Sequence, residues 1–252
     1  MNFGSRHPRF LSLKIRDALV NAEASGLVVP QGLIAHGRGE AFDYIIGERT
    51  IPAASVATMA ASALLLRADW PVISVNGNSV ALAGEDIVRL ASSISASIEV
   101  NLFHRTLERE RLIARYLKKF GATEILGVGP AASEVIGGIS SPRARVDPQG
   151  IGKADVVLIP LEDGDRAKAL EAEGKKIISI DLNPLSRTSQ VASVSIVDNV
   201  VRAVPALIKA SKQMKKLPRS QVEKYASRFN NGTNLADAIE QIVHYLQGWM
   251  EN

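Results

Sequence analysis

The sequence predicts an α/β protein in which a mainly parallel sheet, flanked by helices, follows a helical N-terminal segment. Between residues 71 and 200, short apolar runs alternate with segments of helical periodicity, which is the pattern of βαβ crossovers. Residues 1–70 show helical patterns only. We therefore expect one domain over residues 1–252, with a helical N-terminal part (1–70), a parallel-sheet core (71–200) and C-terminal helices (201–252).

Three helices are expected before the sheet. The first covers residues 9–25, where apolar residues recur at helical spacing, and the second begins at Pro30. The third covers residues 53–67 and is apolar on nearly every face. Such a helix must be buried on all sides, inside the domain or in a subunit interface.

Six apolar runs are strand candidates, and the segments between most of them are helix candidates. The strand candidates are 72–75, 97–102, 124–128, 155–160, 176–180 and 193–197. The helix candidates are 84–95, 106–120, 131–136 and 165–173, with 199–214 and 234–248 closing the chain. The link from Ile180 to Ser193 is interpreted as too short for a helical crossover. Either these two strands are not simple parallel neighbours, or the link carries part of a ligand site.

Composition limits the chemistry and the partners. The chain has 252 residues, a net charge of +4 and no cysteine, which excludes disulfides and thiolate ligands. We find no signal peptide and no run near the roughly 18 apolar residues of a membrane helix, so we expect a cytoplasmic protein. The basic run 209–219 is interpreted as a solvated helix end. We expect small-molecule substrates, with no nucleic-acid or membrane partner.

Two neighbouring strand candidates end in polar tips. The first ends in Asp181–Pro184 and the second in Asp198–Asn199, and Arg187 and Thr188 lie in the link between them. Ligands of open α/β sheets bind at the carboxyl ends of the strands, so we expect a nucleotide at these tips.

Arg38 stands between Gly37 and Gly39 in the run IAHGRGEAFDY. Glycines let a backbone approach a ligand closely, and the guanidinium fork of arginine suits phosphate. Two glycines inside a helix cost roughly 1 kcal/mol each, so we favour a ligand-binding segment over a plain helix.

The same run places His36, Glu40 and Asp43 on one helical face. This is the best metal-ligand pattern in a chain without cysteine, but its spacing matches no metalloenzyme signature. We therefore predict no protein-bound metal site.

Polar residues follow three further strand candidates. Asn76 and Asn78, in SVNGNS, form either a ligand loop or an Asn-Gly turn. His104 and Arg105 are candidates for a phosphate or carboxylate contact. The acidic run 162–165 is interpreted as a helix N-terminus, with carboxylate ligation of a cation as the alternative.

Residues Gly127–Ala132, GVGPAA, match the Gly-x-Gly-x-x-Gly/Ala fingerprint of dinucleotide-binding proteins and follow a strand candidate. Asp147 stands at the spacing of the acidic residue that accompanies this fingerprint. Against this interpretation, the helix expected after the loop is short and is followed by Gly137 and Gly138. A nicotinamide-dependent oxidoreductase is therefore an alternative hypothesis.

Longer blocks of the chain resemble the archaeal phosphopantothenate synthetases, also called 4-phosphopantoate–β-alanine ligases. The blocks are GLIAHGRGEAFDY, SVNGN, VVLIPLEDGDRAKAL and DLNPLSRT with VDNVVRA, and the resemblance covers nearly the whole chain. It implies a homodimer with a Rossmann-like core that uses ATP to join 4-phosphopantoate to β-alanine. The implied products are 4′-phosphopantothenate, AMP and pyrophosphate, in coenzyme A biosynthesis.

The resemblance also implies which residues bind ATP, because the family's contacts match this sequence at Arg16, Arg38, Asp181, Leu182, Asn183, Arg187, Thr188, Asp198 and Asn199. Arg38 is the candidate catalytic residue, since arginine and Mg²⁺ can stabilise charge that develops on the α-phosphate. By placement alone, the substrate phosphate would be met by some of Asn76, Asn78, His104 and Arg105. A protein that binds ATP without turnover is a further alternative.

Overall fold

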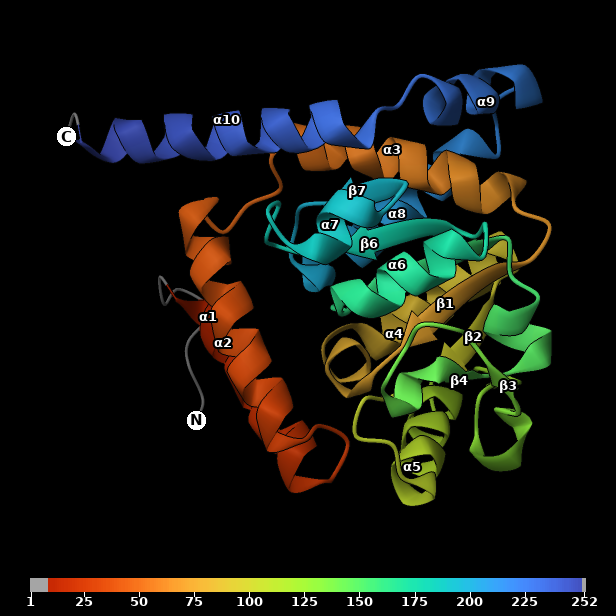
Figure 1. Cartoon of the computed structure of the whole chain (residues 1–252). Coiled ribbons are helices and arrows are strands. Elements are labelled where there is room, and N and C mark those ends of the chain that lie inside the picture. Colours follow the sequence, from red (N-terminus) through yellow and green to blue (C-terminus); the bar gives the residue numbers. More distant parts are fainter. Residues whose placement is uncertain (1–8, 251–252) are drawn as a thin grey trace.

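The computed structural model describes residues 9–250 and confirms the α/β prediction (Figure 1). Its main sheet has five parallel strands in the order β2-β1-β5-β6-β7. These strands are β1 (Pro71–Val75), β2 (Ser97–Val100), β5 (Val156–Pro160), β6 (Lys176–Ile180) and β7 (Val194–Ile196). Parallel strands are covered on both faces, which explains why they read as continuous apolar runs.

Helices pack on both faces of the sheet. Alternate strand residues such as Ile178 and Ile180 join a large core with α4 (Gly77–Ile94) and α8 (Val200–Met214). Ile177 lies in a second core, on the other face, with α6 (Gly164–Ala172). The remaining helices of the sheet region are α5 (Leu107–Lys118) and the short α7 (Arg187–Val191).

The N-terminal third consists of the expected helices α1 (Phe10–Ala24), α2 (Pro30–Ile45) and α3 (Pro52–Arg67). Proline opens α2 and α3, where its missing N–H costs nothing. The apolar α3 packs against α8, β7, α9 (Arg219–Ser227) and α10 (Asn231–Met250), which decides between the two expectations for it. Most of the helix is buried inside one chain, although Val56 is exposed. The sequence interpretation did not include α9.

The prediction of a strand at 124–128 and a helix at 131–136 is wrong. Leu126 makes a single bridge to Glu99, and the backbone then turns at Gly127 and Gly129, which both have positive φ. The short turn Gly129–Ala131 follows, and β3 (Glu134–Val135) pairs with β4 (Arg145–Val146) in a small antiparallel ribbon.

The link between β6 and β7 also differs from the prediction. The two strands are parallel neighbours, and the link contains α7. A crossover of about a dozen residues is sufficient when its helix is as short as α7. Between residues 9 and 250, no helix is long and apolar enough to cross a membrane.

Gly77→Ala is expected to destabilise the protein by about 1–3 kcal/mol. A Cβ at this position would lie 2.3 Å from the backbone carbonyl oxygen of Leu27, which cannot move aside without shifting the turn after α1. Urea unfolding measures the change in the free energy of unfolding.

The matched control is Gly37→Ala, on the interior of α2, where an added Cβ meets nothing within 4 Å. This change is expected to stabilise the protein by up to about 1 kcal/mol through helix propensity. Equal stabilities for the two variants would contradict the close approach of Leu27 to α4.

Candidate active site

The carboxyl ends of all five strands meet at one edge of the sheet, because the strands are parallel. The chain leaves β1 for β2 on one side, whereas β5, β6 and β7 extend the sheet on the other. The strand order therefore reverses between β1 and β5, and this switch point is where open α/β sheets form their ligand crevice. The tips of β5, β6 and β7 adjoin it.

The tip of β6 is a rigid loop centred on Asp181. The carboxylate of Asp181 accepts the backbone N–H of Asn183 at 3.0 Å and the hydroxyl of Ser186 at 2.5 Å. Asn183 in turn accepts the backbone N–H of Leu185 at 2.9 Å. Burial raises the pKa of Asp181, and these hydrogen bonds oppose the rise.

Helix α2 faces this tip. The positive charge of Arg38 is a further influence that opposes the rise in the pKa of Asp181. The exposed guanidinium of Arg38 on α2 therefore acts on the tip of β6. A Cβ at Gly39 would lie 3.7 Å from Leu182, so that glycine faces the β6 loop. The run HGRGE is a regular part of the expected helix α2, and its ligand-binding role stays a prediction.

The tip of β7 is held to α2 by a largely buried cluster of polar and charged side chains, Asp43, Asp198, Asn199 and Arg202. Arg202 on α8 donates to Asp198 at 2.7 Å and to Asp43 at 2.5 Å. The amide of Asn199 donates to Asp43 at 2.7 Å, and Thr50 donates to Asp198 at 2.6 Å. Burial raises the pKa of Asp198, and the charge of Arg202 opposes this. We call these four residues the Asp43 cluster.

Arg16 lies on α1 and contacts α2 rather than a strand tip. Its Nε donates to both carboxylate oxygens of Glu40, at 2.9 and 3.0 Å, and its Nη2 donates to the hydroxyl of Tyr44 at 3.3 Å. The hydrogen bond with Glu40 raises the pKa of Arg16. The structure thus places Arg16 beside α2, the helix that carries Arg38.

The β6–β7 link also reaches the tip of β5. The buried Thr188 donates to the backbone carbonyl of Glu162 at 3.0 Å. Arg187 forms an exposed ion pair with Asp165 at 2.8 Å. Asp163 accepts the backbone N–H of Arg166 and caps α6, which confirms the interpretation of the acidic run as a helix N-terminus.

Asn76 and Asn78 belong to the beginning of α4, so SVNGNS is not a tight turn. Asn76 caps α4, and its Nδ2 donates to the carbonyls of Pro160 and Leu161 at 3.1 and 3.0 Å. It therefore closes the switch point between β1 and β5. Asn78 donates to the carbonyl of Gly32 in α2 at 2.8 Å.

Arg105 holds the 127–145 segment against α5. It pairs with Glu110 and donates to the carbonyls of Gly127 and Arg145, both at 2.7 Å. His104 is exposed, and its ring meets that of Phe103 edge-on. These contacts favour a structural role for Arg105, and a substrate contact by either residue stays a prediction.

The Gly127–Ala132 loop lacks the geometry of a dinucleotide site. The N–H of Gly127 donates to Asp147 at 3.1 Å, and the N–H of Gly129 donates to Glu110 at 2.7 Å. Only a three-residue turn follows, so no α-helix presents its N-terminus to a pyrophosphate. The resemblance of this loop to the fingerprint therefore does not extend to its structure.

The carboxylates near His36 are engaged by arginines. Glu40 binds Arg16, and Asp43 binds Arg202. Burial lowers the pKa of His36. Over residues 9–250, no group of three or more His, Asp or Glu side chains is arranged to hold a metal ion.

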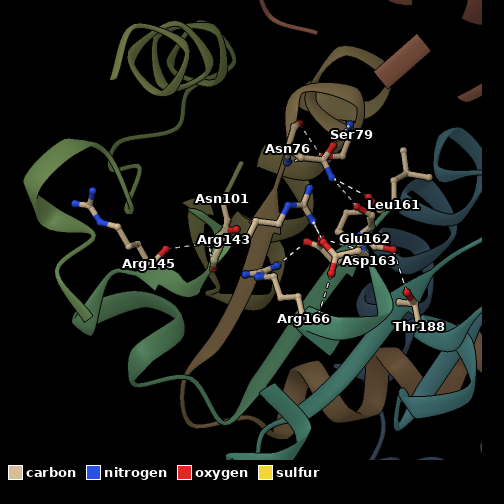
Figure 2. Close-up of polar contacts among 11 residues, drawn as sticks. Asn76, Ser79, Asn101, Arg143, Arg145, Leu161, Glu162, Asp163, Arg166 and Thr188 are labelled. Carbon is tan, nitrogen blue, oxygen red and sulfur yellow. Dashed lines mark hydrogen bonds and ion pairs between the residues drawn. The ribbon is translucent and has the colours of Figure 1, made fainter. Parts of the chain in front are cut away.

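The sequence interpretation missed two buried arginines beside the switch point (Figure 2). Arg166 pairs with Glu162 at 2.5 Å, and Arg143 pairs with Glu162 and, at 3.2 Å, with Asp163. Burial lowers the pKa of both arginines to about 10. One signal was available: Arg166 shares a helical face with Leu170, which packs in the core beneath α6.

Glu99 lies on β2, near these arginines. It is fully buried, and its two carboxylate oxygens accept the backbone N–H groups of Asp147 at 3.1 Å and Ile151 at 2.6 Å. Burial raises its pKa to about 7, and the charge of Arg166 partly opposes this. Glu99 thus anchors the 147–151 segment to the sheet. It is a further buried charge beside the two arginines.

The fold and the site together define a class. This is a Rossmann-like α/β protein whose polar strand tips and facing arginine lie at the carboxyl edge of the sheet, where open α/β sheets bind their ligands. Residues 53–245 match the family described as phosphopantothenate/pantothenate synthetase.

Similar curated proteins agree with this family. The chain is 47% identical to the 4-phosphopantoate–β-alanine ligase of Thermococcus kodakarensis over 96% of this chain and 92% of that protein. It is 49% identical to the ligase of the same name from Methanosarcina mazei, over 96% of this chain and 94% of that protein. The Thermococcus onnurineus ligase is 46% identical, over 94% and 90% of the two chains. The chain belongs to the phosphopantothenate synthetase family.

Asp43→Asn is expected to lower the free energy of unfolding by about 3 kcal/mol, because it leaves Arg202 buried beside one fewer carboxylate. Urea unfolding measures this loss. Asp165→Asn removes an ion pair whose side chains are both more than half exposed, and it should cost less than about 1 kcal/mol. Equal effects of the two variants would show that the Asp43 cluster does not hold α2 to β7.

Proposed function

We propose that this chain is an ATP-dependent ligase that joins 4-phosphopantoate to β-alanine. The products are 4′-phosphopantothenate, AMP and pyrophosphate, in coenzyme A biosynthesis. The observation that carries this function is the identity of 46–49% to relatives named 4-phosphopantoate–β-alanine ligase, over nearly the whole chain.

We place ATP over the tips of β6 and β7. Asp181 and Asn183 would bind the ribose or the adenine, since the Asp181 carboxylate is partly buried and held in one orientation by two donors. The β7 tip would form the second wall, with Asp198 and Asn199 held by the Asp43 cluster. Leu182, Arg187 and Thr188 would complete the pocket. Arg16 would bind the nucleotide only after its ion pair with Glu40 is broken and replaced by a contact with the nucleotide.

The reaction would proceed in two displacements. The carboxylate oxygen of the acid attacks the α-phosphorus of ATP, the bond to the β-phosphate oxygen breaks, and pyrophosphate leaves. The amine of β-alanine then attacks the acyl carbon, the bond to the adenylate oxygen breaks, AMP leaves, and the amine loses its proton to solvent. Arg38 would stabilise the charge that develops on the α-phosphate. Mg²⁺, bound by the phosphate oxygens of ATP, would neutralise the charge on the leaving pyrophosphate.

We further propose that the protein is a homodimer. Helix α10 extends beyond α3 at its C-terminal end (Figure 1). Four of its exposed apolar side chains form one helical stripe, Ile239, Val243, Leu246 and Met250, and Trp249 is exposed as well. This stripe is a better interface candidate than α3, which is covered within its own chain.

The proposed activity predicts stoichiometric formation of AMP and 4′-phosphopantothenate from ATP, Mg²⁺, 4-phosphopantoate and β-alanine. Chromatography of the nucleotides measures the products. ADP as the product, or no turnover with this acid and amine, would contradict the proposal.

Arg38→Ala is expected to reduce kcat by about a hundredfold or more, because it removes a charge that acts on the transition state. Thermal unfolding should be unchanged, since the side chain is exposed. Arg115→Ala, an exposed arginine in the last turn of α5, is the control and should keep wild-type kcat. A wild-type kcat for Arg38→Ala would remove the catalytic role from Arg38.

A further inference from the structure

The switch point contains a pair of arginines with an unusual degree of burial. Arg143, in the short turn Pro142–Ala144, is 7% exposed, and Arg166 on α6 is 0% exposed. Figure 2 shows both side chains converging on Glu162, just beyond the end of β5. Buried charges of one sign usually have a matching number of opposite charges beside them.

The nearby carboxylates Glu162, Asp163 and Glu99 match the charge of this pair but leave some of its donors without a hydrogen bond. Glu162 serves both guanidinium groups, and the carboxylate of Asp163 is partly exposed and also caps α6. Within residues 9–250, Nε of Arg143 and both Nε and Nη2 of Arg166 are buried without a hydrogen-bond partner. Unpaired donors on buried charges are costly, so the pair is suited to a further anion.

Backbone geometry gives a second reason to expect a ligand here. Leu161 has a backbone φ of 56°, in the left-handed region that residues other than glycine seldom adopt. With this backbone conformation, the carbonyl of Leu161 accepts a hydrogen bond from the amide of Asn76. The side chain of the next residue, Glu162, pairs with the arginines. Such backbone strain is concentrated at ligand sites.

The arginine pair also adjoins the proposed nucleotide site. Strand β5 lies beside β6, and Thr188 of the β6–β7 link donates to the backbone carbonyl of Glu162. An acid whose carboxylate lies at the α-phosphate of ATP, over β6, would therefore extend its other end toward β5 and Arg143.

We propose that Arg143 binds the phosphate of 4-phosphopantoate, and that Arg166 is a positioning residue that holds Glu162 and, through it, Arg143. This inference rests on the proposed function. The planar guanidinium can donate two parallel hydrogen bonds to a phosphate dianion, and this would satisfy donors that the nearby carboxylates leave unpaired. The proposed phosphate site is then Arg143 at the switch point, in place of the earlier candidates Asn76, Asn78, His104 and Arg105.

A purely structural role is the competing explanation, since Arg143 also fastens the 142–146 segment to β5. The two roles differ in what they change. A phosphate contact affects only ligands that carry the phosphate, whereas a structural contact affects stability, ATP and every form of the acid together.

The test compares wild type with Arg143→Gln and Arg143→Lys by calorimetric titration of 4-phosphopantoate, without ATP. Arg143→Gln should weaken the Kd about tenfold to a hundredfold, as expected for a lost hydrogen bond to a charged group. Arg143→Lys, which keeps the charge but not the fork, should give an intermediate Kd. Pantoate, which lacks the phosphate, should bind wild type and Arg143→Gln equally weakly, and the KM for ATP should stay within about twofold.

The matched control is Arg145→Gln, two residues along the same segment. Arg145 is exposed, and its Nε donates to the carbonyl of Ala132, away from Glu162. It should bind 4-phosphopantoate like wild type. An unchanged Kd in Arg143→Gln, or an equal loss for pantoate and ATP, would overturn the assignment.

The titration also separates this inference from the proposed function. A wild type that binds 4-phosphopantoate through Arg143 but forms no AMP would leave the phosphate site standing and refute the ligase. A wild type that forms AMP while Arg143→Gln binds the acid normally would support the ligase and refute the phosphate site.

Discussion

The nucleotide side of the proposed active site depends on one buried interaction, the Asp43 cluster. Arg202 is held between Asp43 and Asp198, so α8, α2 and the tip of β7 meet at a single guanidinium group. Charges buried in this way are held together because separating them would leave one uncompensated. The cluster fixes the direction in which α2 crosses the sheet edge, and that direction brings Arg38 within electrostatic reach of Asp181. Helix α2, which precedes the first strand in the sequence, thereby contributes to the proposed site.

The carboxyl edge of the sheet divides the chemistry into two regions. The β6 and β7 tips carry carboxylate and amide groups that suit the hydroxyl and amino groups of a nucleotide, whereas the switch point beside β5 carries buried arginines. Thr188 and Glu162 join the two regions through a side chain–backbone hydrogen bond. A ligase that activates a phosphorylated acid needs this division, because the two ligands must meet at the α-phosphate while their other charges stay apart.

The sequence predicted the fold well because alternating apolar runs report directly on buried parallel strands. It was less accurate where one pattern suits two structures. Asn76-Gly77 fits a tight turn as well as the cap that begins α4, and the structure shows the cap, with a capping box between Asn76 and Ser79 and Gly77 packed against Leu27. Arg143 was missed because its burial depends on Glu162, a residue far from it in the sequence. Arg166 was missed although Glu162 and Leu170 lie four residues before and after it. The residues proposed to bind the nucleotide were predicted from the ends of the strands and from family resemblance. The hydrogen-bond partners that orient these residues are visible only in the structure.

A crystal structure of the protein with a non-hydrolysable ATP analogue and 4-phosphopantoate would test this account most directly. We expect the nucleotide over Asp181–Asn183 and Asp198–Asn199, with Arg38 facing the triphosphate and the phosphate of the acid within hydrogen-bonding distance of Arg143. A nucleotide bound at Gly127–Ala132, or an acid whose phosphate lies away from the switch point, would contradict it.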